Sequence, residues 1–198
     1  MLMTDEAVTP SPGTPAAESA SFVGHSKSLW FFEMALLVVL AFAFAQGIKV
    51  FLVQPFVIPT GSMISTIEIG DRVLTDKLTY RFFGEPAAGD IVVFDDPTGQ
   101  HSQLIKRVVA TEGQTVDIQG GKVYVDGQAL SEPYLDDKST TPGTVEVPLT
   151  IPRDEVWLMG DNRPESGDSR FFGPQPTDIV RGRAFWTYWP LNRFGRLD

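Results

Sequence analysis

The sequence predicts an all-β domain preceded by one membrane-spanning α-helix, and three observations support this fold class. Residues 29–53 are overwhelmingly apolar and long enough for a single span. After residue 53 no segment keeps an apolar spacing of 3.6 residues, so no long amphipathic helix is expected there. Short apolar runs are instead separated by turns, for which the chain has 18 glycines and 15 prolines.

The composition of the 198 residues excludes several classes of function. The chain has 25 acidic residues against 16 Lys and Arg, and its net charge of -9 argues against binding the phosphates of a nucleic acid. Without cysteine it can have no disulfide, thiol nucleophile or thiolate metal site. Its two histidines, His25 and His101, are too few for the usual zinc sites. We therefore expect no metal and no other cofactor.

The first 28 residues are rich in Pro, Ser and Ala and poor in apolar residues, which predicts a disordered tail. As a helix, residues 29–53 would be about 37 Å long, against a hydrocarbon core of about 30 Å. The charged ends of the Glu33 and Lys49 side chains can then reach toward opposite membrane–water interfaces. Lys27 and Lys49 flank the segment almost evenly, so the positive-inside rule barely decides its orientation.

The apolar segment has two other interpretations. A buried helix of a soluble protein, apolar all round, would need a larger core than this chain offers. A cleavable signal peptide is the stronger rival, because Ala43-Phe44-Ala45 has the small residues of a cleavage site. Against it, only Lys27 is a nearby cation in a long preceding region, and apolar sequence resumes at Ile48. We favour a permanent anchor.

Beyond the anchor, short strands are expected. Gly120-Gly121 lies between two apolar runs and is a good signal for a hairpin. Residues 131–152 are polar and marked by prolines, with one short strand among them. The expected strands are 72–76, 90–94, 104–109, 115–118, 122–125, 144–147, 155–159 and 179–189.

Residues 55–77, PFVIPTGSMISTIEIGDRVLTDK, follow the anchor directly and contain a candidate nucleophile. Pro59 fixes its own φ and extends the residue before it, and Gly61 lets another backbone come close. Ser62, on such a turn at the mouth of an apolar groove, is a plausible nucleophile. On these residues alone, an ordinary turn made of Pro, Thr, Gly and Ser remains the better explanation.

Lys106, in LIKRVVATEG, is the candidate general base. In a strand, Lys106 and Arg107 point to opposite faces, so only one of them can face the core side. Burial disfavours the ammonium form, and a neutral lysine can take a proton from serine, which arginine cannot do. A solvated Lys-Arg pair on an edge strand is the competing interpretation, and composition does not separate the two.

The stretch GDNRPESGDSRFFG, residues 160–173, has the composition of a loop whose side chains bond to nearby backbone. Asp161 and Asp168 suggest a calcium loop, but their spacing lacks the EF-hand ligand pattern and its terminal Glu. A structural role is favoured, in which Asp168 and Arg170 pair and Ser166 orients a neighbouring amine or hydroxyl.

PTGSM and GD, then GDIVVF, KRVVATEG and GDNRPESGDSRFFG, in this order after one apolar helix, closely resemble bacterial type I signal peptidase, or leader peptidase. The resemblance extends from Phe56 to YWPLNRFG near the C-terminus. It implies a membrane-anchored serine endopeptidase that removes signal peptides from exported preproteins at Ala-x-Ala-like sites. The enzyme would be single-pass in the bacterial plasma membrane, its catalytic domain on the outer face. Its partners would be preproteins and the lipid bilayer, with no nucleic acid.

The same resemblance implies the domain boundaries. The peptidase domain would comprise residues 54–198, a β-rich core with a small inserted β subdomain at about 114–153. The family usually has proline two residues after the methionine of GSM, and this chain has Ser65 there. Losing that proline should loosen the turn slightly without removing a catalytic group.

The resemblance also implies site residues. Ser62 would be the nucleophile and Lys106 the base, as in the bacterial branch; the endoplasmic-reticulum branch has His in place of this lysine. The Thr60 hydroxyl and the Ser62 backbone N–H would form the oxyanion hole. Ser166 would orient the lysine beside the structural pair of Asp168 and Arg170. The substrate groove would be formed by Phe56, Ile58, Pro59, Met63, Ile67 and Ile105.

Two rival functions come from other classes. A self-cleaving repressor-type protease with a Ser/Lys pair would need an N-terminal DNA-binding domain, for which residues 1–28 are too short and too acidic. A catalytically inactive, membrane-tethered scaffold would have no reason to keep Thr60, Ser62, Lys106 and Ser166 together.

Overall fold

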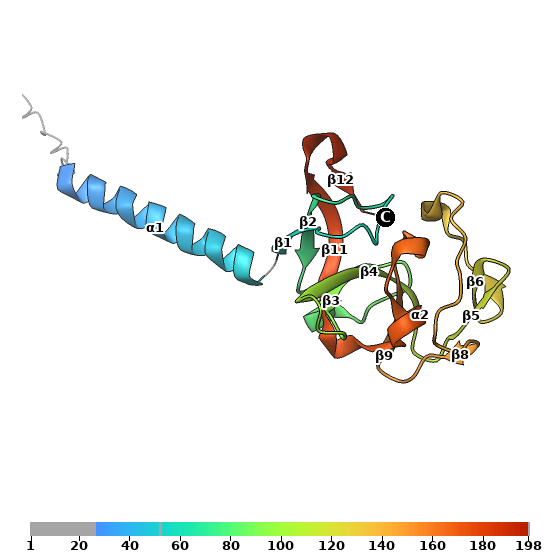
Figure 1. Ribbon diagram of the computed structural model, residues 1–198. Helices are drawn as coiled ribbons and strands as arrows, with labels where there is room; N and C mark the ends of the chain where they lie inside the picture. Colours follow the sequence, from blue (N-terminus) through green and yellow to red (C-terminus); the bar gives the residue numbers. More distant parts are fainter. Residues whose placement is uncertain (1–26, 52, 198) are drawn as a thin grey trace, which may run out of the picture. The chain divides into compact units, whose positions relative to one another are not determined.

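A computed structural model describes residues 27–51 and 53–197 of the chain (Figure 1). The tail expected at residues 1–28 lies outside them except for its last two residues. The first helix, α1, comprises Lys27–Phe51, and strand β1 (Val53–Val57) begins two residues after its end. The expected helix, 29–53, included Val53. In the structure this residue belongs to strand β1 instead.

Helix α1 contains the segment Leu29–Gly47, which is long and apolar enough to cross a membrane. None of this segment is buried within the structure. Apolar side chains that face outward all round a helix are stable in lipid and unfavourable in water. The helix thus fits a membrane-anchored protein.

Among the described residues, eight strands form one antiparallel sheet in the order β1-β2-β11-β3-β4-β9-β10, with β12 paired to β11. The sheet brings β4 between β3 and β9, so the strand that carries Lys106 lies inside the sheet and not at its edge. The bounds are β1 Val53–Val57, β2 Arg72–Asp76, β3 Ile91–Asp95, β4 Gln103–Thr111, β9 Glu155–Met159, β10 Gln175–Pro176, β11 Val180–Trp189 and β12 Gly195–Arg196.

A smaller sheet has the order β7-β6-β5-β8 in the described part of the chain. Its strands lie between residues 114 and 153, the range expected for the inserted subdomain, and its central hairpin turns at Gly120-Gly121 as predicted. That this sheet is a separate folding unit stays a prediction. The bounds are β5 Thr115–Gln119, β6 Lys122–Val125, β7 Gln128–Ala129 and β8 Leu149–Thr150.

The prediction of a strand at 144–147 is wrong, because these residues form no strand in the structure. Val145 and Val147 instead pack as partly buried residues against the core of the small sheet. The Val145 N–H donates to the carbonyl of Arg170 at 2.9 Å, outside any sheet. Pro148 follows and has no N–H to donate, so ladder pairing begins only at Leu149.

Short helical turns connect the strands. Their positions matter because two of them, η3 and α2, lie in the loop that follows β9, beside the candidate site. The turns are η1 Thr79–Phe83, η2 Pro133–Leu135, η3 Arg163–Glu165, α2 Ser169–Phe172, η4 Thr177–Ile179 and η5 Leu191–Arg193.

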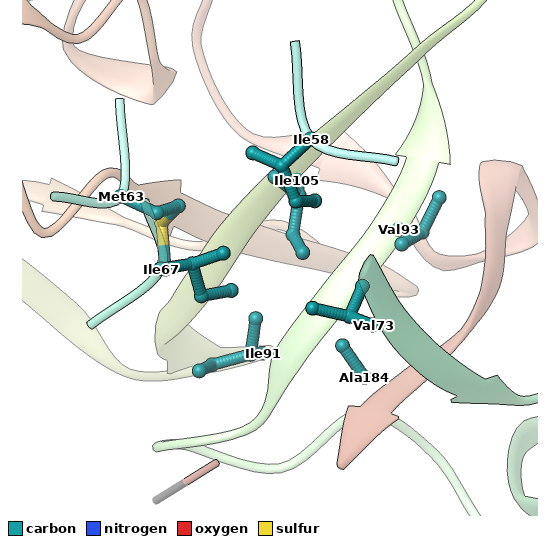
Figure 2. Packing of buried hydrophobic residues seen from close by; sticks show 8 residues of the cluster. All are labelled: Ile58, Met63, Ile67, Val73, Ile91, Val93, Ile105 and Ala184. Atoms are coloured by element: carbon teal, nitrogen blue, oxygen red, sulfur yellow. The ribbon is translucent and has the colours of Figure 1, made fainter. Parts of the chain in front are cut away.

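One core cluster fixes the PTGSM segment against the large sheet. Figure 2 shows this cluster, to which Met63 of the segment and its neighbours Ile58 and Ile67 contribute on either side of Ser62. Strands β2, β3, β4 and β11 contribute the rest. Alternation along β3 sends Val92 and Phe94 to the opposite face, where they join a second cluster. The sheet is thus buried on both faces where residues 61–65, which we call the serine turn, rest on it. The cluster in Figure 2 comprises Ile58, Met63, Ile67, Val73, Ile91, Val93, Ile105 and Ala184.

Candidate active site

The side chains of Ser62 and Lys106 meet in the structure although 44 residues separate them in the sequence. Lys106 Nζ lies 2.7 Å from Ser62 Oγ and also donates to the carbonyl of Ile105 at 3.1 Å. Ser62 is 7 % exposed and Lys106 2 % exposed. The amine is therefore within hydrogen-bonding distance of the hydroxyl and is shielded from bulk water.

The position of Lys106 on β4 explains its unusual environment. Strand alternation puts it on the same face as Leu104 and Val108, and Val92 is its partner on β3. These apolar neighbours leave little water to solvate an ammonium group. Burial accordingly lowers the pKa of Lys106 from its ordinary 10.5 to about 8, against the opposing effect of the Asp168 carboxylate.

The turn that carries Ser62 is held by the loop after β9. The Asn162 backbone N–H donates to the Ser62 carbonyl at 3.0 Å, and Asn162 Nδ2 donates to the Gly61 carbonyl at 2.9 Å. Gly160 has no room for a side chain, because a Cβ there would overlap the Ser62 carbonyl oxygen and Ser166 Oγ. Sequence reasoning missed Asn162 and Gly160, since GDN is also the composition of an ordinary loop.

Ser62 and Lys106 open onto a cavity of about 400 Å³ between the loop of residues 96–101 and the segment 165–172. A second cavity of about 40 Å³ adjoins it and shares Thr60, His101 and Leu104 with it. Among the predicted groove residues, this smaller cavity is lined by Phe56, Ile58, Pro59 and Ile105.

Two predicted groove residues, Met63 and Ile67, line neither of these cavities. Both are fully buried in the core cluster of Figure 2, where they pack the turn that carries Ser62 against the large sheet. Thr60, the predicted oxyanion-hole residue, lines both cavities next to Ser62. Its role stays a prediction.

The predicted pair of Asp168 and Arg170 forms. Arg170 Nε and Nη2 each lie 2.8 Å from an oxygen of Asp168, and both residues are buried. Asp168 also accepts from the Gly160 N–H at 3.1 Å, so it fixes the backbone that contacts the serine turn. Ser166 Oγ is buried and has no hydrogen-bond partner among the described residues, so the structure does not join it to Lys106.

Arg107, the neighbour of Lys106, is also buried, which rules out a solvated Lys-Arg pair on an edge strand. It is 3 % exposed and binds Asp161 through Nε at 3.0 Å and Nη2 at 2.8 Å. Removing one partner of such a buried, bidentate pair strongly destabilises the fold, because the other charge is left buried and unpaired. Both carboxylate oxygens of Asp161 thus accept hydrogen bonds from the buried guanidinium of Arg107.

A serine hydroxyl in contact with a buried amine of lowered pKa, both lining one cavity, has the chemistry that a serine hydrolase needs, because a neutral amine can accept the hydroxyl proton. The family model "Signal peptidase, peptidase S26" matches residues 31–189 of the chain. The chain therefore belongs to the signal peptidase S26 family and is a serine endopeptidase.

Two relatives agree with the family match, and one solved structure is also similar to the chain. The chain is 35 % identical to signal peptidase I of Leptolyngbya laminosa, over 98 % of this chain and 97 % of that protein. It is 33 % identical to signal peptidase I of Mycobacterium tuberculosis, over 82 % of this chain and 74 % of that protein. The crystal structure of a signal peptidase I from Enterococcus faecalis matches with 32 % identity and a TM-score of 0.45, covering 50 % of this chain and 97 % of that one.

Proposed function

We propose that the chain removes signal peptides from exported preproteins at Ala-x-Ala-like sites, with Ser62 as nucleophile and Lys106 as general base. The contact of 2.7 Å between Ser62 Oγ and Lys106 Nζ carries this proposal. Membership of the signal peptidase family supports the substrate class. An inactive scaffold is disfavoured, because keeping a lysine buried and partly neutral beside a serine has a folding cost without a structural benefit.

The proposed reaction begins when neutral Lys106 takes the hydroxyl proton as Ser62 Oγ attacks the scissile carbonyl. The developing oxyanion would be stabilised by the Ser62 backbone N–H and the Thr60 hydroxyl. Lys106, now an ammonium, then gives its proton to the leaving amine, which releases the mature protein and leaves the signal peptide as an ester on Ser62. Lys106 next activates a water that hydrolyses this ester and frees Ser62.

The pocket dimensions suit small substrate side chains. The cavity of about 40 Å³ beside Thr60 is far smaller than the cavity of about 400 Å³ onto which Ser62 opens. Apolar residues line it, including Phe56, Ile58 and Ile105. An extended substrate segment with small apolar side chains can lie here, as in other modes of strand recognition.

We expect cleavage only after Ala or Gly at P1, the residue whose carbonyl Ser62 attacks. A Leu or Phe side chain would clash with the walls of the small cavity, an effect larger than the ~1–3 kcal/mol that one methylene changes. Purified full-length protein is incubated with a preprotein and with its P1 Leu and P1 Phe variants, and the products are sequenced from the N-terminus. Efficient cutting after Leu would contradict the placement of the P1 side chain in the small cavity.

We further propose that α1 is a permanent, single-pass anchor in the bacterial plasma membrane, with the peptidase domain on the outer face. The apolar segment Leu29–Gly47 supports it, because its exposed side chains are suited to lipid. The protein should therefore resist carbonate extraction from membranes and retain the residues before α1. A mature N-terminus at Gln46, just after Ala43-Phe44-Ala45, would show instead that the segment is cleaved.

A further inference from the structure

The segment 131–143, which we call the strap, runs between the small sheet and the loop after β9 (Figure 1, yellow to orange). Its Thr140 N–H donates to the carbonyl of Gly121 in the β5–β6 turn at 2.9 Å. Its Thr141 carbonyl accepts from Arg170 Nη1 at 3.1 Å, which ties it to α2. Leu135 is buried, so the strap is packed in place at its centre as well. The proposed roles of Ser62 and Lys106 do not involve any strap residue.

The strap contacts the serine turn directly at two consecutive residues. Lys138 Nζ donates to the carbonyl of Ile64 at 2.8 Å. Ser65 Oγ donates to the carbonyl of Tyr134 at 3.2 Å. These contacts join residues 74 and 69 positions apart in the sequence. The backbone just after Ser62 is thereby fixed to the strap and not only to its own neighbours.

The strap is itself bound to buried arginines around the site. Arg163 Nη1 donates to Thr140 Oγ1 at 2.6 Å, and its Nη2 pairs with Glu132. The guanidinium of Arg107, the residue next to Lys106, lies 4.0 Å from the centre of the Tyr134 ring. The strap therefore touches the serine turn, the lysine strand and the loop that carries Asn162.

The geometry points to Lys138 as a positioning residue for Ser62. Asn162 holds the carbonyls of Gly61 and Ser62, and Lys138 holds the carbonyl of Ile64, two residues after Ser62. A hydrogen bond from an ammonium group is about twice as strong as one between neutral groups, so it restrains this short turn firmly. With both ends of the turn held, Ser62 Oγ is directed at Lys106 Nζ. This inference rests on Ser62 being the nucleophile, as proposed above.

Lys138→Met tests the inference in the full-length protein with a cleavable preprotein. We expect kcat to fall about 10- to 100-fold, because small displacements of a reacting group have effects of this size. KM should change little, since Lys138 lines neither cavity. The pH midpoint of kcat/KM should also stay that of the wild type, because Lys138 is not the base. Lys122→Met, at an exposed lysine on β6, is the matched control and should retain wild-type kcat.

Two further variants distinguish positioning from folding. Lys138→Arg retains a cationic donor and should recover much of the lost kcat, and Ser65→Ala should lower kcat without changing KM. Unchanged kcat in Lys138→Met, an equal loss in Lys122→Met, or a loss that follows the unfolded fraction in thermal melts would overturn the inference. Ser62→Ala is measured in parallel: if it stays active, the proposed nucleophile is wrong, whereas if it is inactive and Lys138→Met is normal, only the role of the strap is wrong.

Discussion

Ser62→Ala and Lys106→Arg are each expected to lower kcat/KM on a preprotein by about 10⁴- to 10⁶-fold, the range seen when a member of a nucleophile–base unit is removed. Alanine has no hydroxyl to attack the substrate. Arginine keeps the charge and nearly the length of lysine but does not give up its proton at working pH, so it cannot activate Ser62. The double variant should be no worse than either single one, because the two groups act as a unit.

The measurement is single-turnover cleavage of a radiolabelled preprotein by each full-length variant. Lys122→Arg, at an exposed position on β6, serves as the control for a Lys-to-Arg change and should be fully active. Thermal melts establish that the variants are folded. Near-normal turnover by Lys106→Arg would exclude Lys106 as the base.

Gly160→Ala is expected to lower kcat about 100-fold although it removes no chemical group. The new Cβ would overlap the Ser62 carbonyl oxygen and Ser166 Oγ, so the serine turn must move away from the loop. Such a shift breaks the alignment of Ser62 with Lys106, and a misplacement of about 1 Å can cost 100-fold in rate. Overpacking of this kind also destabilises a fold by about 1–3 kcal/mol.

A second glycine provides the control for Gly160→Ala. A Cβ at Gly195, on β12, would have nothing within 4 Å, so Gly195→Ala should keep wild-type kcat and stability. Preprotein turnover at saturating substrate and thermal unfolding are measured for both variants. Wild-type kcat in Gly160→Ala would show that the loop does not position Ser62.

Much of the large sheet could be predicted because its strands carry local signals. Arg72–Asp76 alternates and Glu155–Met159 is a short apolar run, and both form strands with the expected bounds. The prediction of a strand at 144–147 was wrong because its two valines are partly buried against the core of the small sheet without joining the sheet. Apolar alternation reports burial, but not whether the backbone finds a strand partner.

Contacts between distant residues were the part that local patterns could not show. At Arg107 the strand pattern shows only that the side chain points away from Lys106, and nothing local indicates its partner. Its partner is Asp161, 54 positions further along the sequence, and the pair is buried and bidentate. Lysine has no planar fork with which to make this pair, so Arg107→Lys should lower the folding stability. Lys138 shows the same limit, because nothing in the sequence around it indicates that it reaches the carbonyl of Ile64.

The pH dependence of kcat/KM tests the central claim, that neutral Lys106 is the base, most directly. Burial lowers the pKa of Lys106 to about 8, and only the neutral amine can accept the Ser62 proton. Below that pH the lysine is protonated and inactive, so log kcat/KM should rise with unit slope and level off above about pH 8. A midpoint at about pH 6.5, the ordinary pKa of histidine, would contradict the account. So would a kcat/KM that keeps rising up to about pH 10.4, the ordinary pKa of lysine.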